Sequence, residues 1–176
     1  APDAIDTITE IIDESLIKVR DMLRNLSPSI LYELGLVPAL QDYIDGTQEL
    51  TDIEILFEQQ GNRVHLEEPL RVAMFQAICE LITNSVKHAG CNHIWVTLDW
   101  SEADLARVTV ADDGGQGAWW QHLETGTDAP FHLGLLAARE RLQRYDRVIV
   151  HETRPGGGTL TAIRTTEKTE KGVANA

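Results

Sequence analysis

One short segment of the chain places four polar side chains on the same side of a predicted helix. Within residues 80–89, a helical period of 3.6 residues brings together Glu80, Asn84, Lys87 and His88. Carboxylate and carboxamide oxygens suit a hydrated divalent cation, and a lysine ammonium offers a point charge to phosphate oxygens. The segment indicates either a site for a metal ion and phosphate groups or an ordinary solvent-facing polar stripe.

The residue types in this segment favour a site. Thr83 and Asn84 are mediocre helix formers, at positions where a merely solvated face would carry Lys, Glu or Gln. The other side of the helix is apolar and is expected to face the core through Met74, Phe75, Ile78, Leu81, Ile82 and Val86.

A glycine-rich segment follows a predicted strand that ends at Val110. It reads Asp112-Asp113-Gly114-Gly115-Gln116-Gly117. A carboxylate at a strand end can accept a hydrogen bond from an exocyclic amine such as that of adenine, and the glycines let the backbone approach a ring closely. Alone, the segment is more consistent with an ordinary Asp-Gly turn.

Two further glycine sites follow in order along the chain. Gly134 and Leu135 open a predicted helix, whose free amides and positive dipole end suit phosphate. The run from Gly156 through Gly158 to Thr159 is also consistent with a plain hairpin turn. Each site is weak evidence alone, but their order and spacing behind the Glu80–Asn84 helix favour one nucleotide pocket.

The elements that must position these residues alternate in type along the chain. The patterns predict helices at about 36–43, 70–88 and 133–145, and strands at 53–57, 94–98, 106–110, 148–150 and 159–163. Pro69 opens the central helix and Ala89-Gly90 closes it, while residues 101–104 form a hairpin turn. Consecutive strand pairs predict an α+β fold, a two-layer sandwich with a mixed, mainly antiparallel sheet and helices on one face.

A heptad of apolar residues precedes these elements. It predicts a long N-terminal helix that ends at Ser27-Pro28. Its seam is too apolar for a lone helix, so we expect it to pack against another chain or a further helix, through Ile5, Ile8, Ile12, Val19, Met22 and Leu26.

The net charge and the apolar runs disfavour several classes of partner. The net charge is −13, with 28 acidic against 15 basic residues, which disfavours a general nucleic-acid or anionic-membrane surface. No apolar run approaches the roughly 20 residues that span a bilayer, so no membrane insertion is expected. Cys79 falls near the apolar helix face and is expected to be a buried thiol in a reducing cytoplasm.

At this point the set of motifs resembles the ATP-site boxes of the GHKL superfamily, the Bergerat-fold ATPases and kinases. Residues 80–88 resemble the N box, and residues 112–117, 134–135 and 156–159 resemble the three glycine boxes. Residues 16–40, with Leu26-Ser27-Pro28 and Leu34-Gly35-Leu36-Val37-Pro38-Ala39-Leu40, resemble the segment that joins the dimerisation helices to the catalytic domain in sensor histidine kinases of the nitrate-sensor type.

The resemblance implies a role for each box residue. Asn84 would coordinate magnesium on the ATP phosphates, Glu80 would order the ion or its water, and Lys87 and His88 would lie near the phosphates. One of two carboxylates would receive the adenine amine: Asp112 lies two residues beyond inward-facing Val110, whereas Asp113 keeps the family's glycine spacing with Gly115 and Gly117. We favour Asp112. Residues 118–132 would be a lid over ATP.

The resemblance also implies a division of the chain and a reaction. Residues 1–45 would be part of a dimerisation and histidine-phosphotransfer segment, 46–165 the catalytic domain and 166–176 a disordered tail. The parent protein would be a cytoplasmic or membrane-bound sensor. As a homodimer it would move the ATP γ-phosphoryl group to a histidine outside this chain, and from there to a response regulator.

Departures from the family pattern keep two alternatives open. No histidine precedes His65, so the usual phosphoacceptor is absent; His132 stands where a glycine is common, and residues 144–146 replace a glycine-rich turn. The alternatives are an ATP-hydrolysing clamp in which Glu80 activates water, and a degenerate dimerisation module that relays conformation without catalysis.

Overall fold

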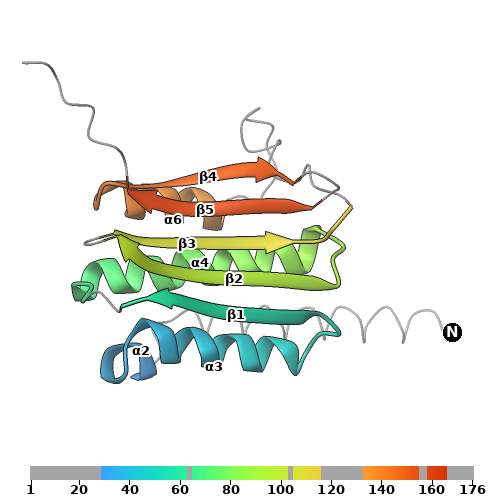
Figure 1. Cartoon of the computed structure of the whole chain (residues 1–176), viewed down its shortest axis with the longest axis horizontal. Coiled ribbons are helices and arrows are strands. Elements are labelled where there is room, and N and C mark those ends of the chain that lie inside the picture. The colour runs from blue at the N-terminus through green and yellow to red at the C-terminus, as the bar shows by residue number, and fades with distance from the viewer. Residues whose placement is uncertain (1–28, 63–64, 103–104, 116–132, 155–157, 166–176) are drawn as a thin grey trace, which may run out of the picture.

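The computed structural model describes residues 29–62, 65–102, 105–115, 133–154 and 158–165 (Figure 1). The helices are α2 (Ser29–Glu33), α3 (Leu36–Gln48), α4 (Glu68–His88) and α6 (Leu133–Gln143). The strands are β1 (Glu54–Gly61), β2 (His93–Glu102), β3 (Leu105–Asp112), β4 (Arg147–Thr153) and β5 (Thr159–Thr165). The predicted N-terminal helix, the lid at 118–132 with His132, and the tail lie outside the described residues.

The five strands form one sheet in the order β1-β2-β3-β5-β4. β1 runs parallel to β2, whereas the β2–β3, β3–β5 and β4–β5 pairs are antiparallel. Helices α4 and α6 lie behind the sheet in Figure 1, while α2 and α3 lie beside β1. The predicted mixed, mainly antiparallel sheet with helices on one face is therefore confirmed.

The core lies between the sheet and α4. Alternate residues of β2, from Ile94 to Trp100, are at most 5% exposed, as the strand period of two requires. The predicted apolar side of α4 is also confirmed, because five of its residues are at most 1% exposed: Met74, Phe75, Ile78, Leu81 and Ile82. Cys79 is buried as predicted and forms no disulfide within the described residues.

Helices α2 and α3 join the same core. The short α2 is absent from the sequence prediction, and α3 continues five residues past the predicted end at Tyr43. The Thr47 hydroxyl donates to the Tyr43 carbonyl at 2.8 Å, and Tyr43 itself packs edge-on against Phe75 of α4. Because tertiary packing covers this last part of α3, the helix runs through Gly46 despite the low helix propensity of glycine.

The ends of α4 follow the sequence closely, whereas β1 and β2 each end four residues beyond the predicted strands. Pro69 lies in the first turn of α4 and Ala89 forms its C-cap, as predicted. In the β2–β3 hairpin, however, Glu102 still belongs to β2 and pairs with Leu105, so the predicted turn over residues 101–104 begins too early. Among the described residues, no helix is long and apolar enough to cross a membrane.

His151 on β4 is expected to make stability depend on pH. Its Nδ1 lies 2.8 Å from the Thr161 hydroxyl, and burial, together with the smaller effect of the Arg139 charge, lowers the pKa of His151 to about 4. Between pH ~6.5, the ordinary histidine pKa, and pH ~4, the unfolded chain binds the proton and the folded chain does not, so stability falls as pH falls.

The free energy of unfolding should fall by about 2 kcal/mol, a value reduced from the full pKa difference because the ring is partly open to solvent. Urea denaturation at pH 7 and at pH 4.5 measures it, and His151→Gln should remove most of the difference. The same change at exposed His65 serves as the control. A pH dependence that His151→Gln leaves intact would assign the effect to other groups.

Candidate functional site

The carboxylate of Asp112 is held at the point where β3 ends. The residue is 1% exposed, and its Oδ1 accepts hydrogen bonds from the backbone amides of Gly114 and Thr159, each at 3.1 Å. Its Oδ2 accepts from the Ser85 hydroxyl of α4 at 3.1 Å. Helix α4, the loop after β3 and the start of β5 therefore meet at one buried carboxylate.

The neighbouring carboxylate of Asp113 bonds elsewhere. Its Oδ1 accepts from the backbone amides of Asn92 and His93 at 2.8 and 2.9 Å, and its Oδ2 lies 2.7 Å from His93 Nδ1. The bond from the His93 amide contributes most to lowering the pKa of Asp113 to about 2. Both oxygens of Asp113 thus contact the residues at the start of β2, so Asp112 is the stronger candidate for a ligand contact.

Two glycines allow the backbone to close around Asp112. A Cβ at Gly114 would lie 2.1 Å from the Ala89 carbonyl oxygen, and a Cβ at Gly158 would lie 2.1 Å from the Asp112 carbonyl oxygen. A Cβ at Gly115 would meet no atom of the described residues within 4 Å. Of the residues predicted for these boxes, four lie outside the described residues: Gln116, Gly117, Gly156 and Gly157.

Thr159, whose backbone amide donates to the Asp112 carboxylate, carries a buried hydroxyl. The residue is 1% exposed, and its Oγ1 has no hydrogen-bond partner within the described ranges. A buried polar atom without a partner costs roughly 1–3 kcal/mol, so such an atom calls for an explanation. Adenine presents an amine donor next to a ring-nitrogen acceptor, and a carboxylate beside a hydroxyl is the complementary pair. The residues present therefore fit an adenine base.

The polar side of α4 faces α6 and is only partly open to solvent. Asn84 is 6% exposed, and its Nδ2 donates to Glu80 Oε1 at 3.4 Å. A Cβ at Gly134 would lie 2.3 Å from the same Glu80 oxygen, so this carboxylate packs on the first turn of α6. The interpretation of the segment as a plain solvent-facing stripe is therefore wrong for Glu80 and Asn84.

The remaining predicted residues differ in their surroundings. Lys87 is exposed and His88 half-buried at the end of α4. Leu135 is 4% exposed and its side chain belongs to the core, so only its backbone is available to a ligand. Within the described ranges, no group of three His, Cys, Asp or Glu side chains is arranged to hold a metal ion. A magnesium ion at Asn84 and Glu80 would need phosphate oxygens as further ligands.

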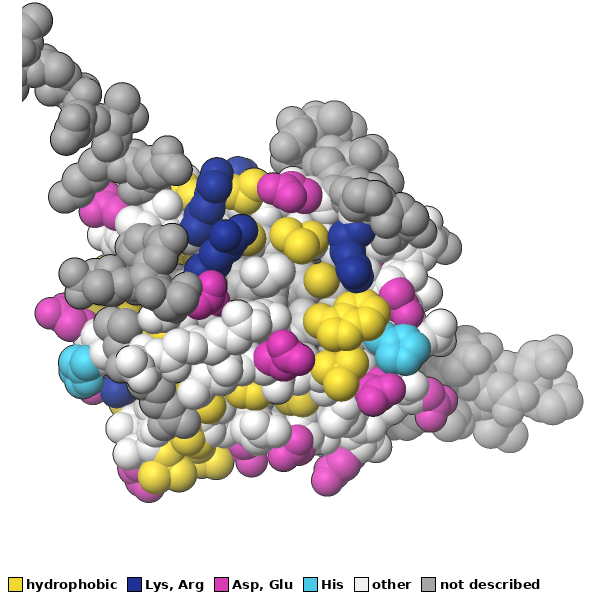
Figure 2. All heavy atoms as spheres, in the orientation of Figure 1, with side chains coloured by type: hydrophobic (Ala, Val, Ile, Leu, Met, Phe, Trp, Pro, Cys, Tyr) yellow, Lys and Arg dark blue, Asp and Glu magenta, His cyan; other side chains and the backbone are white. Residues whose placement is uncertain are grey.

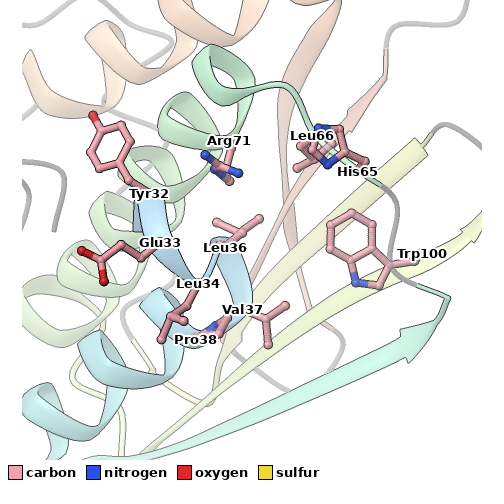
Figure 3. A pocket seen from close by; sticks show the side chains of 11 residues that line it. Tyr32, Glu33, Leu34, Leu36, Val37, Pro38, His65, Leu66, Arg71 and Trp100 are labelled. Atoms are coloured by element: carbon pink, nitrogen blue, oxygen red, sulfur yellow. The ribbon is translucent and has the colours of Figure 1, made fainter. Parts of the chain in front are cut away.

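A separate pocket lies near the first turn of α4. It has a volume of about 390 Å³ and is lined by the α2–α3 turn, Arg71 and Trp100 (Figure 3). Arg71 precedes Asn84 by thirteen residues, about 20 Å along the helix. Arg71 Nε and Trp100 Nε1 are, like Thr159 Oγ1, buried without a hydrogen-bond partner in the part of the chain that the structure describes. This pocket is distinct from the residues around Asp112.

Comparison with known proteins identifies the class. Residues 70–169, more than half of the chain, match the family described as "Histidine kinase-, DNA gyrase B-, and HSP90-like ATPase". The chain therefore belongs to this ATPase-domain family. Its fold also matches the blue-light activated histidine kinase of Erythrobacter litoralis (TM-score 0.58, 18% identity, 77% of this chain and 43% of that one).

Individual relatives are sensor histidine kinases. The chain is 28% identical to the histidine-protein kinase/phosphatase DegS of Brevibacillus brevis, covering 95% of this chain and 42% of the relative. It is 29% identical to the sensor histidine kinase MctS of Rhizobium johnstonii, covering 90% of this chain and 34% of the relative. The chain thus spans less than half the length of these relatives and is homologous to their ATPase domain.

Two residues at the site escaped the sequence analysis. Ser85 lies in the segment that resembles the N box but off the polar stripe. The available signal was a mediocre helix former on the side of the helix that faces the core. Arg154 donates from Nη1 to the Asp112 carbonyl at 3.3 Å, and a single arginine before a glycine run gives no signal of this contact.

Proposed function

We propose that this chain binds MgATP around Asp112 and forms the catalytic part of a sensor histidine kinase of the nitrate-sensor type. The observation that carries the proposal is the buried Asp112 carboxylate together with Thr159, whose backbone amide donates to it and whose buried hydroxyl has no partner among the described residues. This pair complements the amine and ring nitrogen of adenine. Membership of the ATPase-domain family supports the same ligand.

Each group of residues would have one task in holding the nucleotide. Asp112 would accept the adenine amine and Thr159 would donate to the ring. Asn84 and Glu80, joined at 3.4 Å, would hold the magnesium ion or its water. Magnesium, when bound, neutralises charge on the phosphate oxygens.

Phosphate contacts would come from both ends of the site. Lys87 and His88 end α4, and the amides at Gly134 and Leu135 lie in the first turn of α6, where free N–H groups favour anions. The glycines at 114, 115, 117 and 158 would let the backbone approach the nucleotide. The chain would therefore act by positioning and electrostatics, without a covalent group of its own.

The wider kinase reaction would involve parts beyond these residues. Residues 1–45 would carry the second helix of a dimerisation bundle, 46–165 the catalytic domain and 166–176 a tail. The phosphoryl group would pass to a histidine outside this chain and then to the receiver domain of a response regulator. The domain would work in the cytoplasm, within a homodimeric sensor.

Removal of the Asn84 side chain tests the proposal. Calorimetric titration of the wild type with ATP should show saturable binding that magnesium strengthens. Asn84→Ala should weaken MgATP binding roughly tenfold, equivalent to about 1.4 kcal/mol, and should lose most of the magnesium effect. Asn62→Ala, in the exposed segment after β1, is the matched control. No saturable binding by the wild type would overturn the proposal.

Two assays separate the alternatives. Sustained release of inorganic phosphate would favour an ATP-hydrolysing clamp in which Glu80 activates water. Absence of nucleotide binding would favour a degenerate relay module. With radiolabelled ATP, we expect the chain to bind nucleotide without labelling itself, since no histidine precedes His65.

A further inference from the structure

Arg154 connects the turn after β4 to the backbone of Asp112. Its Nη1 donates to the Asp112 carbonyl oxygen at 3.3 Å, and its backbone amide donates to the Gly158 carbonyl at 3.0 Å. Gly158 approaches that same Asp112 oxygen so closely that a Cβ there would lie 2.1 Å from it. One turn therefore contacts the Asp112 carbonyl in two ways.

The guanidinium of Arg154 is held over an aromatic ring on β2. Its Cζ lies 5.1 Å from the Trp95 ring centroid, within the range of a cation–π contact. Trp95 in turn stacks on His93, with centroids 5.8 Å apart and planes at 21°. Figure 2 views the face of the sheet opposite to α4, where hydrophobic, histidine and basic side chains gather on the right.

These contacts return to the residue next to Asp112. His93 Nδ1 lies 2.7 Å from Asp113 Oδ2, and Asp113 also accepts from the backbone amide of His93. Arg154, Trp95, His93 and Asp113 thus form a closed set of contacts around the peptide unit between residues 112 and 113. We call these four residues the latch.

The latch and the Asp112 carboxylate lie on opposite faces of the sheet. The carboxylate bonds to Ser85 of α4, on the helix side. Trp95 alternates with the core-facing Ile94 and Val96, so it lies on the side without helices. Arg154 therefore contacts Asp112 at the backbone carbonyl. Arg154 can affect a ligand of the Asp112 carboxylate only by changing the orientation of Asp112.

We propose that Arg154 is a positioning residue that fixes the Asp112 peptide so that the carboxylate meets the adenine amine. This inference rests on the proposed function. Hydrogen bonds from a charged donor are the stronger ones, and the carbonyl and side chain of Asp112 share one Cα. Loss of the guanidinium frees the carbonyl, and the carboxylate then spends less time in the receiving orientation.

Two nucleotides that differ only at the base test this role. The probes are MgATP and the magnesium complex of purine riboside triphosphate, which lacks the exocyclic amine. Arg154→Met should weaken ATP binding roughly five- to tenfold and change binding of the deamino analogue less than twofold. Arg154→Lys, which keeps a cation over the indole, should restore part of the loss. Trp95→Leu should act in the same direction, and Trp95→Phe should retain ATP affinity.

The control and a structural readout make the result decisive. Arg164→Met removes an exposed arginine from β5, with the same change in net charge, and should alter neither affinity. Amide NMR shifts of Gly114 and Thr159, which donate to Asp112 Oδ1, should move in Arg154→Met and stay in Arg164→Met.

Each other outcome overturns the inference in a different way. Equal losses for both nucleotides would show a general effect on the fold, and unchanged ATP binding would show that the latch does not act on the site. A wild-type chain that binds neither nucleotide would overturn the proposed function and this inference with it. If the wild type binds ATP more tightly than the deamino analogue but the latch variants keep wild-type ATP affinity, the proposed function stands and this inference is overturned.

Discussion

Asp112→Asn is expected to weaken ATP binding about a hundredfold while the domain stays folded. The asparagine oxygen can keep the two backbone bonds that Oδ1 accepts from Gly114 and Thr159, and its amide can donate to the Ser85 hydroxyl. The position of Oδ2 then carries a donor that faces the amine of adenine. Loss of a charge-assisted bond together with two opposed donors accounts for about 2.7 kcal/mol.

The measurement is a titration of MgATP on the wild type and on Asp112→Asn, with urea denaturation of both proteins. Asp52→Asn, exposed before β1, removes the same charge away from the site. The analogue without the amine should bind both proteins with similar affinity. ATP affinity within threefold of the wild type would mean that Asp112 does not receive the base.

The fold was largely predictable because long periodic elements carry strong signals. Helix α4 has 21 residues, and its apolar side, its start at a proline and its end before a glycine all agree with the sequence prediction. By contrast, α2 has five residues, which is too few for a helical period to show. The end of α3 was missed because Gly46 and Asp45 look like a break, whereas packing against α4 extends the helix.

The site was predictable in its residue types and less so in its connections. Alternation along β3 puts Asp112 on the core side with Val110, and this favoured it from the sequence. The bonds that commit Asp113 to Asn92 and His93 join positions about twenty residues apart. The contact between Arg154 and Trp95 spans an even longer separation, so no local pattern could reveal it.

Gly158→Ala is expected to destabilise the domain by about 3 kcal/mol and to weaken ATP binding as well. Two costs add at this position: φ is +88°, where an L side chain is strained, and the new Cβ would lie 2.1 Å from the Asp112 carbonyl oxygen. That oxygen belongs to backbone, so relief requires β5 and the end of β3 to move apart. Such a movement also stretches the bond from Thr159 to Asp112.

Two other glycines separate the costs. Gly90 has φ +60° but nothing within 4 Å of a Cβ, so Gly90→Ala should cost about 1 kcal/mol from strain alone. Gly115 has no left-handed φ, and none of the described residues lies within 4 Å of a Cβ there, so Gly115→Ala should be nearly neutral. Urea denaturation ranks the three variants. If Gly158→Ala costs no more than Gly90→Ala, the close approach of β5 to the Asp112 carbonyl does not shape this site, because strain alone would explain the loss.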